Sequence, residues 1–189
     1  MPKIVNHNQK RLEILDASFD VFAKQGYAAL SMRQLAKSLG VTTGTLYHYF
    51  PSKPSLFYSL FHRLQEEDLL AASQEFSEVS QPVERAKAMG AYIRNRSPRL
   101  TKALQIALEY QRVQPEEGAQ EFLDLTIRGY QDALKENLKL PNKESAELLL
   151  SLILGMLIHS SLAPQASNLE SQLSIIEGIY LSLLAEHKP

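Results

Sequence analysis

The sequence predicts an all-α protein of about nine helices. Apolar residues recur at spacings of three and four along most of the chain, which is the period of a helix with one buried face. Glycine and proline stand at the breaks between these segments. Alternating runs of β-branched residues, which would indicate strands, are absent from the sequence.

A first helix is expected over residues 8–25, and Gly26 supplies its C-terminal stop. Its buried face is predicted to consist of Leu12, Leu15, Phe19 and Phe22.

Two short helices follow. Ser31 and Gln34 have the spacing of a capping box at the start of the second helix, and Gly40 ends that helix. Either Thr42 or Thr43 is expected to cap the third.

A long fourth helix is predicted from Ser52, its cap, to Phe76, because Pro54 is tolerated in a first turn. Ser167 and Glu170 have the spacing of a further capping box before the last helix. Later breaks are expected at Gln81-Pro82, Ser97-Pro98, Gln114-Pro115, Leu140-Pro141 and Pro164.

Composition is that of an ordinary globular protein, with 189 residues, 44% hydrophobic and 22% charged. The sequence holds no cysteine, which excludes disulfides and thiolate metal sites and fits a reducing compartment. The first ten residues lack the pattern of a signal peptide, so a cytoplasmic location is expected. No cofactor is expected.

Charge is distributed unevenly. Residues 1–63 hold eight Lys/Arg against three acids, for a net charge of +5. Residues 64–189 hold twelve against eighteen, for a net charge of −6. A basic segment attached to an acidic one is typical of a module that binds a polyanion, although a chance distribution remains the alternative.

The segment from Ser31 to Phe50, SMRQLAKSLGVTTGTLYHYF, has the features of a helix-turn-helix. Ala36 allows close helix approach, Gly40 suits the tight turn, and Val41 and Leu46 bury the second helix against the first. The exposed side chains of that second helix include no acid, and Gly44 lets backbone approach a groove. Such a surface suits base edges, phosphates and thymine methyls; its members are Thr42, Thr43, Thr45, Tyr47 and His48.

Residues 8–57 resemble the N-terminal signature of the TetR (TetR/AcrR) regulators. The resemblance is carried by Phe22-Ala23, Gly26-Tyr27, Gly40-Val41, Thr45-Leu46-Tyr47, Tyr49, Phe50 and Lys53, and it departs from the family at Pro54-Ser55. It implies a helix-turn-helix DNA-binding domain over residues 1–52 and a helical effector-binding and dimerisation domain over residues 53–189. The implied function is a repressor that a small-molecule effector releases from a palindromic operator in double-stranded DNA.

Carried over position by position, the resemblance implies contacts with bases or phosphates from Arg33, Thr43, Thr45, Tyr47, His48, Tyr49 and Lys53. Ser31 is expected to cap its helix with the N-terminus aimed at a phosphate. An equally good interpretation of Tyr49 is that it packs against the protein and does not contact a phosphate.

The most apolar stretch is LLLSLILGMLI, from Leu148 to Ile158. It is about half the length of a membrane span, so a buried helix explains it better and no membrane partner is expected. In the resembled family the last two helices form a four-helix dimer interface, and residues 143–163 and 168–187 fit that pair. The expected interface residues are Leu152, Gly155, Leu173, Ile176, Ile179, Tyr180 and Leu183. The alternative is the core helix of a monomer.

The resemblance also implies an effector pocket among the middle helices. Candidate lining residues are Met89, Tyr92, Arg96, Tyr110, Phe122, Met156 and His159. Arg94, Arg96 and Arg99 could attract an anionic effector or simply form a solvated face.

Two other classes of protein compete with this interpretation. An enzyme is disfavoured, because the sequence has no nucleophile elbow or phosphate loop and its five histidines show no metal-ligand spacing. A helical adaptor that binds proteins through the same domain is the main alternative, but it would not explain the Thr/Tyr/His surface on a basic domain.

Overall fold

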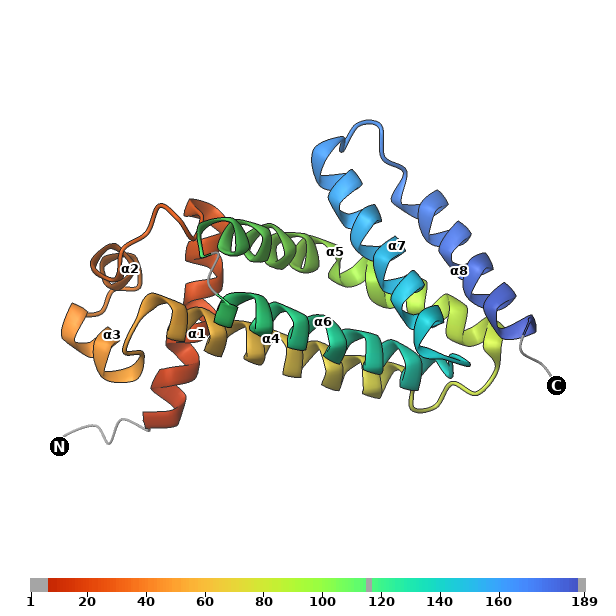
Figure 1. The fold of residues 1–189 in the computed structure, drawn as a ribbon, viewed down its shortest axis with the longest axis horizontal. Helices are drawn as coiled ribbons and strands as arrows, with labels where there is room; N and C mark the ends of the chain where they lie inside the picture. The colour runs from red at the N-terminus through yellow and green to blue at the C-terminus, as the bar shows by residue number, and fades with distance from the viewer. Residues whose placement is uncertain (1–6, 115–116, 187–189) are drawn as a thin grey trace. The chain divides into compact units, whose positions relative to one another are not determined.

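The computed structural model describes residues 7–114 and 117–186, and all its regular elements are helices. They are α1 (His7–Gln25), α2 (Met32–Ser38), α3 (Thr43–Tyr49), α4 (Lys53–Phe76), α5 (Pro82–Val113), α6 (Glu117–Leu138), α7 (Lys143–Leu162) and α8 (Leu169–Ala185) (Figure 1). The all-α prediction is therefore confirmed, with eight helices in the described residues instead of about nine.

Two compact units divide the chain. The head unit consists of the described residues among 1–64 and 105–122, and the body unit consists of those among 65–104 and 123–189. Helices α4, α5 and α6 each contribute residues to both units. The head unit is thus larger than the predicted domain of residues 1–52, since it takes in the start of α4, the end of α5 and the start of α6.

Proline 98 does not break its helix, and this accounts for the smaller helix count. Pro98 lies inside α5, where it cannot donate the backbone hydrogen bond that the carbonyl of Arg94 would otherwise accept. The hydroxyl of Ser97 donates to that carbonyl at 3.1 Å. Because a side chain satisfies the orphaned acceptor, the prediction of a new helix at Ser97-Pro98 is wrong.

Two other local predictions are also corrected. Helix α8 is capped by Asn168, whose side chain accepts from the backbone N–H of Ser171, and not by Ser167 with Glu170. Leu12 is 39% exposed; the residues that α1 buries are Ile14, Leu15, Ser18 and Phe22.

The head unit has an aromatic core. Phe57 of α4 stacks on Tyr110 of α5, with ring centroids 3.9 Å apart and an interplanar angle of 11°. Tyr27, which follows α1, meets both rings edge-on at 5.3 and 5.0 Å. The three rings are buried, so they join the turn after α1 to α4 and α5.

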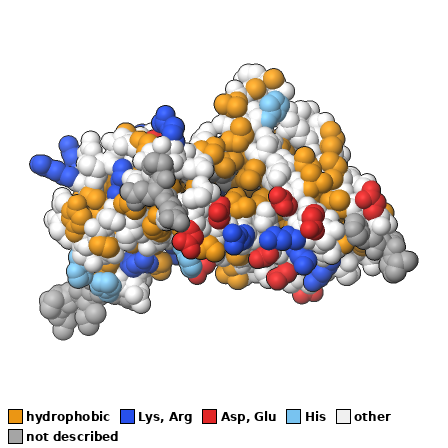
Figure 2. All heavy atoms as spheres, in the orientation of Figure 1, with side chains coloured by type: hydrophobic (Ala, Val, Ile, Leu, Met, Phe, Trp, Pro, Cys, Tyr) orange, Lys and Arg blue, Asp and Glu red, His pale blue; other side chains and the backbone are white. Residues whose placement is uncertain are grey.

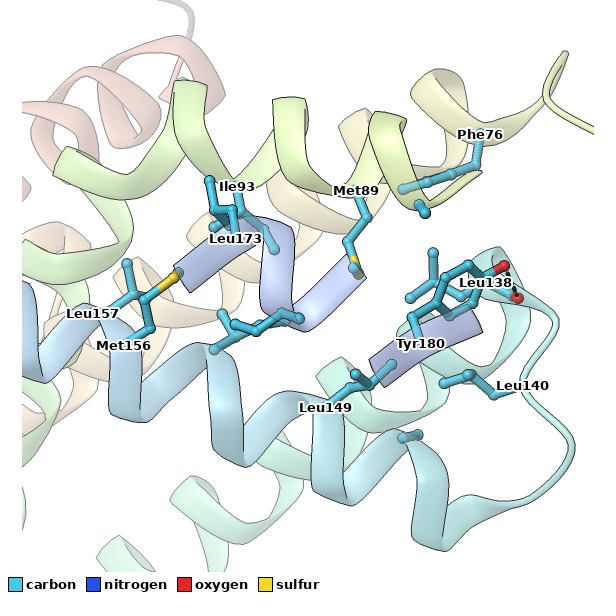
Figure 3. Packing of buried hydrophobic residues seen from close by; sticks show 14 residues of the cluster. Phe76, Met89, Ile93, Leu138, Leu140, Leu149, Met156, Leu157, Leu173 and Tyr180 are labelled. Carbon is cyan, nitrogen blue, oxygen red and sulfur yellow. Dashed lines mark hydrogen bonds between the residues drawn. The ribbon is translucent and has the colours of Figure 1, made fainter. Parts of the chain in front are cut away.

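The body unit has an aliphatic core that α7 and α8 share with α5 and the end of α6 (Figure 3). The hydroxyl of Tyr180 donates to the carbonyl oxygen of Leu138 at 3.0 Å, which satisfies the one polar atom of this buried ring. Figure 3 shows the apolar side chains of this core pointing toward one another; those labelled are Phe76, Met89, Ile93, Leu138, Leu140, Leu149, Met156, Leu157, Leu173 and Tyr180.

A buried carboxylate ties three helices of the body unit together. Asp68 of α4 is 5% exposed, and its oxygens accept from Arg96 of α5 at 2.6 Å and from the hydroxyl of Tyr130 of α6 at 3.0 Å. Arg99 lies 3.7 Å from the same carboxylate and also pairs with Glu67. Burial raises the pKa of Asp68, and these neighbours offset part of that shift.

Replacing Asp68 tests this network. Asp68→Ala leaves the Arg96 guanidinium and the Tyr130 hydroxyl without their acceptor, so we expect a loss of about 2–3 kcal/mol in the free energy of unfolding by urea. Asp132→Ala, at an exposed aspartate of α6, is the control and should change the free energy by less than about 0.5 kcal/mol. Equal values for the two variants would show that the network contributes nothing to stability.

Candidate nucleic-acid interface

Helices α2 and α3 form the predicted helix-turn-helix. Leu35, Ala36 and Leu46 are 0 to 1% exposed, which fixes the packing of the two helices on each other. Gly40 has a φ of +67°, so the turn needs a residue that tolerates the left-handed region. The N–H of Val41 donates to the carbonyl of Ala36 at 3.0 Å, and the N–H of Gly40 donates to the carbonyl of Lys37 at 3.2 Å. These two bonds form a Schellman motif, which ends α2 and is followed by α3.

Both helices are capped as predicted. The Ser31 hydroxyl accepts from the N–H of Gln34, whose side-chain oxygen accepts from the N–H of Ser31, so the capping box is confirmed. Thr42, not Thr43, caps α3 by accepting from the N–H of Thr45 at 3.0 Å, and the two hydroxyls lie 2.8 Å apart. Two of the hydroxyls assigned to DNA, those of Ser31 and Thr42, therefore already cap helix ends, and their DNA contacts stay a prediction.

The remaining surface of α3 faces solvent. Gly44 and His48 are exposed and Tyr47 is 50% exposed, while Thr43 and Tyr49 are half-buried. Helices α1, α2 and α3 have no acidic residue in their first turns. On the face that Figure 2 shows, acidic side chains are numerous among those coloured over the body unit and few over the α1–α3 region.

The structure adds His7 to this surface, although the spacing of the five histidines in the sequence does not indicate it. Its Nε2 atom lies 3.2 Å from Nε2 of His48, and its ring lies 4.5 Å from that of Tyr49. The two histidines are 41 positions apart in sequence, so no local spacing could reveal the pair. In the described part of the chain no group of three or more His, Cys, Asp or Glu is placed to hold a metal ion.

The basic residues of the head unit divide into two groups. Arg11 lies over the Phe50 ring at 5.0 Å and donates to Ser59, and Arg63 pairs with Asp16 at 2.7 Å. Arg33 and Lys37 project from α2 into solvent and form no ion pair within the described residues. These two cations are therefore available to a polyanion.

Lys53 has a role that the sequence did not predict. Its ammonium donates to the carbonyl oxygens of Tyr27 at 2.9 Å and Leu30 at 2.7 Å, and it lies 4.1 Å from the centre of the Tyr27 ring. Burial lowers the pKa of Lys53, and the negative charge of Glu109 offsets part of that shift. Lys53 thus fixes the segment between α1 and α2, and its contact with the DNA backbone stays a prediction.

The candidate effector residues fall in both compact units. Tyr110 and Phe122 belong to the aromatic core of the head unit, whereas the other five lie in the body unit. There Met89 and Met156 are buried in the aliphatic core. Tyr92 donates to the backbone oxygen of Asp68, and Arg96 pairs with its carboxylate. The exposed His159 lies 2.8 Å from the Gln172 amide. Neither unit brings all seven together.

The predicted dimer residues also separate into two groups. Leu173, Ile176 and Tyr180 are 0 to 4% exposed and belong to the protomer's own core, so their part in an interface stays a prediction. Helix α8 has apolar residues on two faces, so the sequence alone could not tell which face the protomer's own chain covers. The remaining expected residues are at least partly exposed: Leu152, Gly155, Ile179 and Leu183.

Exposed side chains extend this surface of α7 and α8 beyond the predicted set. Leu148 is 45%, Leu162 79% and Ile175 61% exposed. A Cβ atom added at Gly155 or Gly178 would meet nothing within 4 Å, so both glycines lie open. We call this set, together with the four partly exposed residues just named, the α7–α8 face.

Helix α7 is long and apolar enough to span a membrane, with a mean hydropathy of 1.6 over its best window, and it is the one such helix among the described residues. Seven of its residues are buried in the protein. Burial of that side is what the core helix of a globular domain shows.

Comparison with known proteins agrees with this geometry. Residues 14–60 match the model of the bacterial regulatory proteins of the tetR family. The chain is 37% identical over 83 residues to the transcriptional repressor KstR of Mycobacterium tuberculosis, which covers 44% of this chain and 33% of KstR. It is 37% identical over 59 residues to the regulator UidR of Escherichia coli, and this match covers 31% of this chain and 30% of UidR. The matched region thus spans about a third of these relatives.

Solved structures extend the likeness to nearly the whole chain. The fold matches FadR of Bacillus subtilis, solved in complex with stearoyl-CoA, with a TM-score of 0.75 at 19% identity over 90% of this chain and 97% of that one. It matches a TetR regulator of Haloarcula marismortui with a TM-score of 0.77 at 16% identity over 93% and 98%. The N-terminal segment of this chain is thus similar to the tetR family of bacterial regulatory proteins, and its fold is similar to that of solved TetR regulators.

Proposed function

We propose that the chain is a transcriptional repressor that reads operator DNA through α3. The observation that carries this proposal is the solvent-facing side of α3, where Gly44, Tyr47 and His48 are exposed and the helix has no acidic residue. A rigid surface of this kind fits the major groove, where bases are distinguished by hydrogen-bond donors, acceptors and methyl groups. Arg33 and Lys37 would add phosphate contacts from α2.

We further propose that two copies of the chain associate through the α7–α8 face. Exposed leucine and isoleucine side chains with two open glycines suit close packing of helices from a second copy. A dimer places two recognition helices about 34–36 Å apart, one turn of DNA, and so selects a palindromic operator.

A small-molecule effector completes the proposal. The structural relative FadR was solved with stearoyl-CoA, which supports an effector for this chain without identifying it. Binding would act by shifting the population of conformers that bind DNA. A repressor of this kind works in the cytoplasm, where the operator is. The adaptor alternative is disfavoured, because the tetR-family match covers the segment that contains α2 and α3.

The first test removes the side chains expected to reach the bases. Operator DNA is selected from a random pool with the wild-type protein, and binding is measured by fluorescence anisotropy. Tyr47→Ala/His48→Ala should weaken specific binding by about 1–3 kcal/mol per lost contact. Scrambled DNA is the matched control, on which variant and wild type should bind with similar affinity. Unchanged specific affinity in the double variant would remove these two residues from the interface.

The second test concerns phosphate contacts. Arg33→Ala should weaken binding to all sequences alike and reduce the slope of log K against log salt by about 1, because one fewer counterion is released. Lys87→Ala, at an exposed lysine of α5, should leave the slope unchanged. The same slope for Arg33→Ala and wild type would mean that Arg33 does not lie on the backbone.

The third test addresses the dimer. Ile175 of α8 and Leu70 of α4 are both 61% exposed, so they form a matched pair. Ile175→Asp should shift the protein toward monomer in sedimentation equilibrium and weaken operator binding, because it places a charge in the α7–α8 face. Leu70→Asp should remain dimeric. A dimer in both variants would place the interface elsewhere.

A further inference from the structure

The short segment between α1 and α2 receives a carboxylate from α5. Oε2 of Glu109 accepts from the N–H of Tyr27 at 2.8 Å, and Oε1 accepts from the N–H of Ala28 at 3.1 Å. Each oxygen thus has its own backbone donor, and both bonds are strengthened by the negative charge.

Glycine at position 26 makes this approach possible. Gly26 has a φ of +80°, and a Cβ atom there would lie 2.9 Å from both carboxylate oxygens of Glu109. A side chain would therefore push the carboxylate out of the turn as well as strain the backbone.

The carbonyl groups of the same segment bind a side chain of α4. While the two N–H groups face Glu109, the carbonyls of Tyr27 and Leu30 accept from the Lys53 ammonium. The segment is held between an anion and a cation from two different helices. Three residues after Ala28 comes Ser31, the cap of α2, which packs on α3.

We propose that Glu109 is a positioning residue that sets the direction in which the helix-turn-helix leaves α1. This inference rests on the proposed function, because the orientation matters only if α3 must enter a groove. Helix α5 is 32 residues long and also contributes to the body unit, so Glu109 is the point at which that helix holds the backbone before α2. In a dimer, a change in this direction alters the distance between the two recognition helices and hence the half-site spacing that binds best.

The substitution Glu109→Gln tests the charge with almost no change in shape. The amide retains one acceptor oxygen and turns an NH2 group toward a backbone N–H, so one hydrogen bond is lost and two donors face each other. Glu121→Gln, at an exposed glutamate of α6 in the same unit, makes the same change in net charge and is the control.

Binding is measured on the selected operator and on versions with one or two base pairs added to or removed from its centre. Glu109→Gln should bind the preferred spacing about tenfold more weakly and discriminate less between spacings. Glu121→Gln should reproduce the wild type. A residue that only stabilises the fold would lower the melting temperature and leave the spacing preference intact. Wild-type affinity and spacing preference in Glu109→Gln would overturn the proposal.

Backbone hydrogen exchange separates this inference from the proposed function. Glu109→Gln should accelerate exchange at Tyr27 and Ala28 and also through α2, whether or not the protein binds DNA. If the wild type selects no DNA, the proposed function fails and exchange still decides. Acceleration confined to those two amides, with α2 unchanged, would contradict a positioning role.

Discussion

The backbone between α1 and α2 depends on charge supplied by other helices. Neither Tyr27 nor Leu30 belongs to a helix, and apart from the bond from the Leu30 N–H to the Tyr27 carbonyl their backbone groups need partners from other segments. Lys53 supplies donors and Glu109 supplies acceptors, and the buried Tyr27 ring lies beside the lysine. Burial of an ammonium is costly, and two carbonyls and a ring face compensate for it here. Tyr27 of this segment packs in the aromatic core of the head unit. The segment also leads directly into the cap of α2, and α2 leads into α3.

The helix ends of the head unit could be predicted well, because the residues that indicate each end lie close together in the sequence. The caps at Ser31 and Thr42 and the stop at Gly40 each depend on residues a few positions apart. A rule of the same kind failed where a neighbouring group compensated for a helix breaker. Ser97 satisfies the carbonyl that Pro98 leaves free.

Contacts between distant residues lay beyond sequence reasoning. The pairing of His7 with His48 and the use of Lys53 inside the protein require the chain to be folded first. The phase of an apolar helix is hidden for a related reason. Ile175 and Ile176 are adjacent and identical, yet one is 61% and the other 4% exposed. Hydrophobic periodicity identifies α8 as a core helix but does not say which of its two apolar faces is covered by its own chain.

The aromatic core of the head unit also determines how the protein can be observed. The chain has no tryptophan and eight tyrosines, so tyrosine dominates its near-ultraviolet signal. Tyr27 and Tyr110 are buried in fixed mutual orientation in the head unit, and Tyr180 is buried in the body unit. Circular dichroism in the near-ultraviolet therefore reports the rigidity of these sites without a label. Loss of that signal with retained helical signal would mark a state whose helices persist while their packing is fluid.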